Sequence, residues 1–234
     1  MFKPLSRKQA VVECGMAIGD NVKDEYFRQY RGYPSRYREV KDFTIDHLQH
    51  LALYHALLQY EEIAHRVIGR IKTPEDVFEK VDRPNRVPVP PQIVSLEQLE
   101  SEITDIVGVR VILDYLSDVW RFIEIINSSP IWEEVAPDEN YIDPPQPNGY
   151  RSYHLLKWTP VKDANPCRCE IQVRTANQDS WATKTHKLIY GKRMKLNGDP
   201  VKRSLMTISR TISDLLYSCD ILADEVREGV KRLS

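Results

Sequence analysis

The segment that most constrains the fold is residues 106–114, IVGVRVILD, which is rich in β-branched residues and predicts a buried strand. Two more strands are predicted at 153–161 and 168–175, with a hairpin turn at 163–166 between them. A short strand is expected near 132–135. The chain therefore builds at least part of its core from a sheet.

Helices are predicted where apolar residues recur every three or four positions. The clearest of them covers 44–70, with Thr44 as its N-cap. The other predicted helices cover 74–81, 93–104, 116–129, 177–192 and 201–233. Because helices and strands do not alternate strictly, we expect an α+β fold in which helices flank a mixed, largely antiparallel sheet.

The last helix carries an apolar stripe with two possible uses. It could pack against its own sheet, which is the more common case, or between subunits. The stripe consists of Leu205, Ile208, Ile212, Leu215, Leu216, Cys219, Leu222 and Val226.

Composition limits the kind of protein. The chain has 234 residues, 41% of them hydrophobic, which is enough for one solid core. No apolar run approaches the ~20 residues of a membrane-spanning helix, and the N-terminus lacks the apolar core of a signal peptide. The four cysteines are too few for a disulfide scaffold. We therefore expect a cytoplasmic protein.

We divide the chain into an N-terminal arm, residues 1–43, and a main domain, residues 44–234. The arm interleaves tyrosines with Arg28, Arg31, Arg36 and Arg38. These side chains could contact nucleic acid, or the tyrosines could dock on the core. The net charge of −1 disfavours only a globally basic nucleic-acid-binding protein.

Four polar patches interrupt the apolar segments. They begin at Gly69, Asp105, Asn148 and Glu170, and the first continues to Lys80, Arg83 and Arg86. In the last patch, polar and apolar residues alternate, so Glu170, Gln172 and Arg174 face one side of a strand. Any single patch could be a surface ion pair.

If the strands at 106–114 and 168–175 are neighbours, Asp105 and Glu170 could converge. Two carboxylates form the kind of oxygen site in which Mg²⁺ also binds waters and substrate phosphates. Arginines from the other patches would bind a polyphosphate through forked hydrogen bonds. The four patches together predict phosphoryl or pyrophosphoryl transfer.

The same patches resemble the synthetase domain of RelA/SpoT homologues. The resemblance is carried by DIVGVRVI, PQPNGYRSYHL, EIQVRT and WATKTHKLIYGK, and it extends from about residue 45 to about residue 225. The chain resembles a single-domain small alarmone synthetase. This implies a nucleotidyltransferase-like fold and transfer of the β,γ-pyrophosphate of ATP to a ribose 3′-hydroxyl, with release of AMP.

The resemblance also implies roles for individual residues. Asp105 would hold Mg²⁺, and Glu170 would share the metal or act as the base on the 3′-hydroxyl. Arg110 would act with them at the catalytic centre and bind ATP. The remaining ATP-binding residues would be Arg70, Lys72, Lys80, Arg83, Arg86 and Arg174. The acceptor would lie against Tyr150, with Gln146, Asn148, His154 and Gln172 near it.

Gln146 departs from the family's pattern. Alarmone synthetases usually carry a lysine there, which contacts the 5′-diphosphate of the acceptor. A lost charge-assisted contact costs about 1.5–3 kcal/mol. That corresponds to roughly tenfold to hundredfold weaker GDP binding. Thr185-His186 also replaces the Glu-His that is frequent in the family.

A toxic branch of the family modifies the 3′-CCA end of tRNA, which has no 5′-diphosphate. We therefore expect a tRNA acceptor, with an antitoxin protein as partner. The predicted tRNA contacts are Arg28, Arg31, Arg36, Arg38, Lys184, Lys187, Lys192 and Arg193. The alternatives are GDP or GTP as acceptor, giving ppGpp or pppGpp, an adenine nucleotide as acceptor, or a catalytically silent nucleotide- or RNA-binding module.

Overall fold

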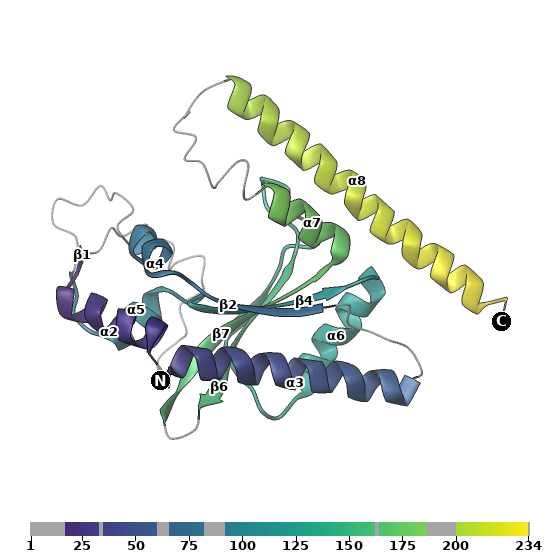
Figure 1. The fold of residues 1–234 in the computed structure, drawn as a ribbon. Coiled ribbons are helices and arrows are strands. Elements are labelled where there is room, and N and C mark those ends of the chain that lie inside the picture. Colours follow the sequence, from purple (N-terminus) through teal and green to yellow (C-terminus); the bar gives the residue numbers. More distant parts are fainter. Residues whose placement is uncertain are drawn as a thin grey trace.

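The computed structural model describes residues 17–32, 35–59, 66–81, 92–161, 164–185 and 200–233. A five-stranded mixed sheet forms its centre, in the order β2-β4-β7-β6-β5 (Figure 1). Strands β4 and β7 are parallel, and the other neighbouring pairs are antiparallel, which confirms the predicted α+β class. The strands are β2 (Arg66–Ile71), β4 (Val107–Leu113), β5 (Glu133–Asn140), β6 (Tyr153–Val161) and β7 (Ala164–Thr175).

Helices lie on both sides of this sheet. Helix α3 runs under one face, and α7 and α8 lie on the other side (Figure 1). Short strands β1 (Ala17–Ile18) and β3 (Gln92–Ile93) pair beside α2 and α5. The helices are α2 (Asp20–Arg31), α3 (Arg36–Gln59), α4 (Pro74–Val81), α5 (Leu96–Glu102), α6 (Leu116–Ser128), α7 (Ala176–Thr185) and α8 (Pro200–Lys231).

The two faces of the sheet differ in polarity because side chains alternate along each strand. Val109 of β4 pairs with Ile171 of β7, and both are buried in the core on the face that α3 covers. One position further along, Arg110 pairs with Gln172 on the opposite face. The sheet therefore separates an apolar core from a polar surface.

Helix α3 corrects one prediction. It begins at Arg36, so Thr44 lies inside the helix and is not its N-cap. The Thr44 hydroxyl donates a hydrogen bond to the carbonyl oxygen of Val40 at 2.7 Å, one turn earlier. The division of the chain at residue 44 stays a prediction, although α3 runs through it.

The predicted C-terminal end of the helix over 44–70 was also wrong. Residues Arg66–Ile71 form β2, whose side chains alternate between exposed and half-buried. Pairing with β4 at the edge of the sheet decides this conformation. The predicted antiparallel pairing of the strands at 153–161 and 168–175 is confirmed, but residues 164–166 belong to β7 and not to the turn. Asp163 lies outside the described residues.

Two tyrosines of the N-terminal arm dock on the core, which is one of the two interpretations given for this segment. Tyr26 and Tyr37 are fully buried, with ring centroids 5.6 Å apart. The Tyr26 hydroxyl donates to the carbonyl oxygen of Lys72 at 2.8 Å, and that of Tyr37 donates to Glu100 at 2.6 Å. Burial raises the pKa of both hydroxyls.

No helix in the described part of the chain is both long enough and apolar enough to cross a bilayer.

Gly69 and Gly108 provide a matched test of how closely α3 packs on the sheet. A Cβ at Gly69 would lie 2.6 Å from Lys41 Cγ and 2.7 Å from Ile45 Cδ1, both on α3. We expect Gly69→Ala to lower the free energy of unfolding by about 1–3 kcal/mol, since overpacking displaces a close-packed helix. Urea denaturation followed by circular dichroism measures this change.

Gly108→Ala is the control, because its Cβ would meet no heavy atom closer than 3.8 Å on the other face of the sheet. The control variant should unfold within about 0.5 kcal/mol of the wild type. Equal stability of the two variants would contradict the close approach of α3.

Candidate active site

The parallel pairing of β4 and β7 brings the predicted catalytic carboxylates to one region. Asp105 precedes β4, and Glu170 of β7 pairs with Gly108. The carboxylate of Asp105 lies between two cations, 2.8 Å from Lys72 Nζ and 2.9 Å from Lys80 Nζ. Burial alone would raise the pKa of Asp105, but Lys80 and Lys72 hold it below its ordinary value. The negative charge of Glu170 opposes this lowering of the Asp105 pKa.

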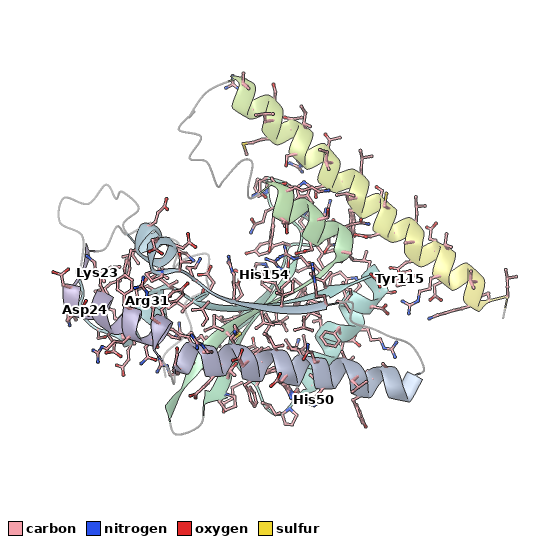
Figure 2. All side chains as sticks on the ribbon, viewed as in Figure 1. Lys23, Asp24, Arg31, His50, Tyr115 and His154 are labelled. Carbon is pink, nitrogen blue, oxygen red and sulfur yellow. The ribbon has the colours of Figure 1, made fainter. Side chains whose placement is uncertain are left out.

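Glu170 is buried and held by its neighbours on the sheet. Gln172 Nε2 donates a hydrogen bond to Glu170 Oε1 at 2.7 Å. The other carboxylate oxygen lies 3.6 Å from His154 Nδ1, on the adjacent strand β6. Figure 2 shows His154 between the sheet and α7, on the polar face.

A polar network continues from Glu170 in both directions. His154 Nε2 lies 2.8 Å from the Tyr150 hydroxyl, at hydrogen-bond distance. On the other side, Arg174 Nη2 donates to Gln172 Oε1 at 3.3 Å. The amide of Gln172 thus bridges Glu170 and Arg174.

Asp179 forms ion pairs with three arginines. It was not predicted as a site residue. Its carboxylate lies 2.9 Å from Arg110 Nη1, 3.2 Å from Arg174 Nε and 3.6 Å from Arg66 Nη2. These arginines come from β4, β7 and β2, so one side chain of α7 connects three strands. The only sequence signal was its position, one helical turn after EIQVRT.

The start of α7, and hence Asp179, is held in place by a capping box. Thr175 Oγ1 accepts a hydrogen bond from the Gln178 backbone N–H at 3.2 Å, and Gln178 Oε1 accepts one from the Thr175 backbone N–H at 3.1 Å. The Thr175 hydroxyl also donates to Asp220 of α8 at 2.7 Å. Helix α8 therefore braces the junction between β7 and α7.

Helix α8 also braces the turn that presents Tyr150. Gly149 has φ +91°, and a Cβ there would lie 3.0 Å from the Cα of Arg210. The Ser213 hydroxyl donates to the Gly149 carbonyl oxygen at 2.5 Å. The Asn148 side-chain oxygen accepts from the Tyr150 N–H at 2.9 Å, so Asn148 shapes the turn itself.

Tyr150 lies among other aromatic side chains. Its ring centroid is 5.6 Å from that of His154 and 6.5 Å from that of Trp181. Burial raises the pKa of its hydroxyl. The backbone of Gln146 closes the same turn, donating to the Tyr150 carbonyl at 3.0 Å and accepting from the Gly149 N–H at 2.8 Å.

A shallow hollow of about 60 Å³ opens on the polar face, lined in part by Arg70, Gly108, Arg110 and Gln172. Because Gly108 has no side chain, the floor is open between the two arginines. A larger cavity of about 230 Å³ lies elsewhere, against α5, and is lined in part by Arg36, Glu100, Trp158 and Arg168. We place the candidate site at the smaller hollow, because Arg70, Arg110 and Gln172 line it and Glu170 pairs with Gly108 beside it.

Sequence comparison assigns the chain to a family. The family described as "Region found in RelA / SpoT proteins" matches residues 69–195. The chain belongs to the RelA/SpoT family. Two similar curated proteins are both from Bacillus subtilis (strain 168). GTP pyrophosphokinase YwaC is 32% identical over 138 residues, which cover 58% of this chain and 60% of that protein. GTP pyrophosphokinase YjbM is 29% identical over 169 residues, which cover 70% and 74%.

Solved structures of the family share the fold. Small alarmone synthetase 1 from Bacillus subtilis, bound to its product pppGpp, superposes with a TM-score of 0.72 at 23% identity. The match covers 87% of this chain and 98% of that one. Small alarmone synthetase 2 from the same organism gives 0.64 at 26% identity, covering 85% and 96%. The predicted resemblance to RelA/SpoT homologues is confirmed.

Two of the residues expected to bind ATP in this RelA/SpoT protein, Arg70 and Arg110, line the hollow. Gln172, which was expected near the acceptor, lines it too, and Lys72 and Lys80 flank Asp105. Arg174 is buried behind Gln172, against Asp179. Arg83 and Arg86 lie outside the described residues.

The predicted tRNA contacts are dispersed. Figure 2 shows Arg31 on α2, far from His154, and Arg28 lies on the same helix. Arg36 forms an ion pair with Glu100 and is largely buried, and Arg38 is half-buried. Lys184 is exposed on α7, whereas Lys187, Lys192 and Arg193 lie outside the described residues.

The donor set around Asp105 fits Mg²⁺. Asp105 and Glu170 offer oxygen atoms, which Mg²⁺ prefers. Among the described residues, no group of three or more His, Cys, Asp or Glu side chains is arranged to hold a metal.

Asp179 allows a test of the arginine cluster. Arg174 is only 1% exposed, so Asp179→Asn removes the carboxylate from a buried guanidinium. We expect the free energy of unfolding to fall by about 2–4 kcal/mol, measured by urea denaturation. Asp20→Asn is the control, because its ion pair with Lys23 is exposed and should contribute little. Wild-type stability in Asp179→Asn would show that other contacts hold the arginines.

Proposed function

We propose that this chain is a pyrophosphokinase that transfers the β,γ-pyrophosphate of ATP to the 3′-hydroxyl of GDP or GTP, forming ppGpp or pppGpp. The main support is that Asp105 and Glu170 lie on one polar face with Arg70, Lys72 and Arg110. The curated relatives YwaC and YjbM, which are named GTP pyrophosphokinases, agree with this enzyme class. The region matched to YwaC spans only 60% of that protein, so its activity is transferred here as a proposal.

The donor triphosphate binds in the hollow between Arg70 and Arg110. Guanidinium groups bind phosphate through paired hydrogen bonds, and lysines contribute point charges. Lys72 and Lys80 already neutralise Asp105 before any nucleotide arrives. Asp105, with Glu170 beside it, would hold Mg²⁺. The ion would neutralise negative charge on the triphosphate.

Glu170 is the base in this proposal. The 3′-oxygen of the acceptor forms a bond to the β-phosphorus of ATP, and its proton passes to Glu170. The bond between the β-phosphorus and the oxygen bridging to the α-phosphorus breaks, and AMP leaves with that oxygen. The hydrogen bond from Gln172 Nε2 to Glu170 Oε1 orients the carboxylate of the proposed base.

The acceptor base lies against Tyr150, whose turn is rigid because Asn148 and α8 hold it. Gln146 occupies the position of the lysine that meets the 5′-diphosphate in related synthetases. We propose that Gln146 weakens GDP binding without changing the acceptor class.

The expected tRNA acceptor has less support than GDP or GTP. Both B. subtilis relatives compared above are named GTP pyrophosphokinases. Tyr26 and Tyr37 of the arm are buried rather than available for stacking on bases. Arg36 is engaged by Glu100. Gln146 remains the one observation that favours tRNA, and an antitoxin partner has no independent support.

Glu170→Gln tests the base. The variant should lose pyrophosphate transfer by about 10²–10⁴-fold, since amide nitrogen and oxygen do not accept the proton. Turnover is measured with γ-³²P-ATP, Mg²⁺ and GDP or GTP, and ATP binding by calorimetry. ATP binding should remain measurable, and Glu133→Gln, an exposed position on β5, should keep full activity. Wild-type turnover in Glu170→Gln would refute its role.

Gln146→Lys tests the acceptor. We expect its KM for GDP to fall by about tenfold to hundredfold, because the lysine restores a charge-assisted contact. Gln146→Met, which has similar length and no charge, should bring no gain. The same assay offers deacylated tRNA as a competing acceptor. Label that appears in tRNA and not in guanosine nucleotides would overturn the proposed acceptor.

A further inference from the structure

The cavity of about 230 Å³ lies at the end of the sheet where α3 begins and α5 lies (Figure 1). It is separate from the hollow between Arg70 and Arg110, because the two share no lining residue. The proposed pyrophosphate transfer therefore makes no use of this cavity.

Part of the wall of the cavity is apolar and buried. Ile103, Ile106 and Cys167 line it and are only 4%, 3% and 3% exposed, and the ring of Trp158 adds to them. Burial raises the pKa of the Cys167 thiol to about 12, so this group stays neutral at physiological pH. An apolar cavity of about 150 Å³ is enough to hold benzene. The larger volume here therefore has room for an aromatic or large aliphatic side chain.

The charged side chains of the cavity lie nearer to solvent. Glu97 is exposed, and Arg168 and Arg36 are half-buried. Arg36 forms an ion pair with Glu100. Arg168 and Glu97, by contrast, form no ion pair with any residue that the structure describes. One cation and one anion at this cavity are therefore available to a ligand.

Arg168 is held in position to bind a carboxylate. Its Nη1 atom donates a hydrogen bond to the carbonyl oxygen of Ser101 at 3.2 Å, and its guanidinium lies over the Trp158 ring, 5.0 Å from the centroid. Among the described residues, no partner takes up the Nε and Nη2 atoms of Arg168. Two such donors bind a carboxylate through parallel hydrogen bonds, and a guanidinium fixed in advance loses less entropy on binding.

We propose that this cavity binds a free α-amino acid with an aromatic or large aliphatic side chain. The carboxylate of the ligand pairs with Arg168, its ammonium group lies near Glu97, and its side chain packs on the apolar wall. A nucleoside polyphosphate does not match this cavity, because Arg168 is its one cation without a countercharge among the described residues.

The cavity adjoins the loop that carries Asp105. Ile103 caps the end of α5 and Ile106 precedes β4, so two cavity residues lie on either side of Asp105 in the chain. The Ile106 carbonyl oxygen accepts a hydrogen bond from the Lys72 backbone N–H at 2.7 Å, and Lys72 Nζ contacts the Asp105 carboxylate. A bound amino acid therefore restrains the loop of the proposed Mg²⁺ ligand. This step alone rests on the proposed function.

L-phenylalanine is the first probe, added to the full chain without nucleotide. Calorimetry should give saturable binding with a Kd below about 1 mM, and glycine, which lacks the side chain, should not bind. Phenethylamine lacks the carboxylate and should bind about tenfold to hundredfold more weakly. 3-Phenylpropionate lacks the ammonium group and should bind about two- to fivefold more weakly, since Glu97 is exposed.

Two outcomes of this titration count against the proposal. The absence of saturable binding by L-phenylalanine, L-tryptophan and L-leucine up to about 10 mM would overturn it. Binding of 3-phenylpropionate at least as tight as that of L-phenylalanine would refute the role of Glu97 and the assignment of an amino acid.

Substitutions at the two charges test where the ligand binds. Arg168→Gln should weaken L-phenylalanine binding by about tenfold to hundredfold, and Glu97→Gln by about two- to fivefold. Glu102→Gln, exposed on α5 and outside the cavity, should keep the wild-type affinity. Circular dichroism and the urea midpoint show that each variant is folded. Wild-type affinity in Arg168→Gln would refute the proposed carboxylate contact.

Trp158 reports on the location of the probe. Because phenylalanine does not emit in the tryptophan range, its binding should change the tryptophan emission of the chain, which has four tryptophans. Trp158→Phe should lose this change while calorimetry still detects binding. An emission change that persists in Trp158→Phe would place the probe beside another tryptophan and overturn the assignment to this cavity.

A non-hydrolysable ATP analogue tests the connection to Asp105. With Mg²⁺ present, saturating L-phenylalanine should change the Kd of the analogue about fivefold or more, and the analogue should change the Kd of L-phenylalanine by the same factor. Unchanged affinities would refute the restraint of the Asp105 loop. Binding of L-phenylalanine without nucleotide does not depend on the proposed reaction, so failure of this site and failure of the proposed function are distinguishable.

Discussion

The parallel pairing of β4 with β7 is the constraint on which the site depends. Its register sets Gly108 beside Glu170 and Arg110 beside Gln172, so the polar members of two separate motifs share one face. Asp105 precedes the first of these strands, and Thr175 ends the second and caps α7. Asp179 therefore lies over the same strands from which Arg110 and Arg174 project. A shift of this register by one residue would turn the polar trio of β7 into the core.

The charges of the site are paired within the chain. Lys72 and Lys80 both contact the carboxylate of Asp105, and Arg110 and Arg174 share the carboxylate of Asp179. Buried charges need such partners, because an isolated charge in a low-dielectric interior is costly. The pairing also fixes the side chains before a ligand arrives, which reduces the reorganisation that binding requires. The polar network from Tyr150 to Arg110 therefore stabilises the buried charges. It also fixes the side chains that would bind a ligand.

Helix α8 supports the candidate site with one side and exposes its other side to solvent. Its polar side contacts the Gly149 turn and the Thr175 cap, and its apolar side is exposed. Ser209, Ser213 and Asp220 of this helix are buried, while Leu205, Leu215 and Leu222 are exposed.

The sequence by itself determined the strands at β4, β6 and β7, the helices α4 and α6, the polar face of EIQVRT and the RelA/SpoT resemblance. These follow from local periodicity and motif spacing, which a single chain segment carries. Only the tertiary structure decided that residues 66–71 form a strand, because their apolar residues also fit a helix until β4 pairs with them. The arginine cluster at Asp179 required the meeting of three strands. The direction of the α8 stripe was likewise decided by contacts with Gly149, Thr175 and Asp118, since periodicity defines the two sides of a helix but not which one its own domain covers.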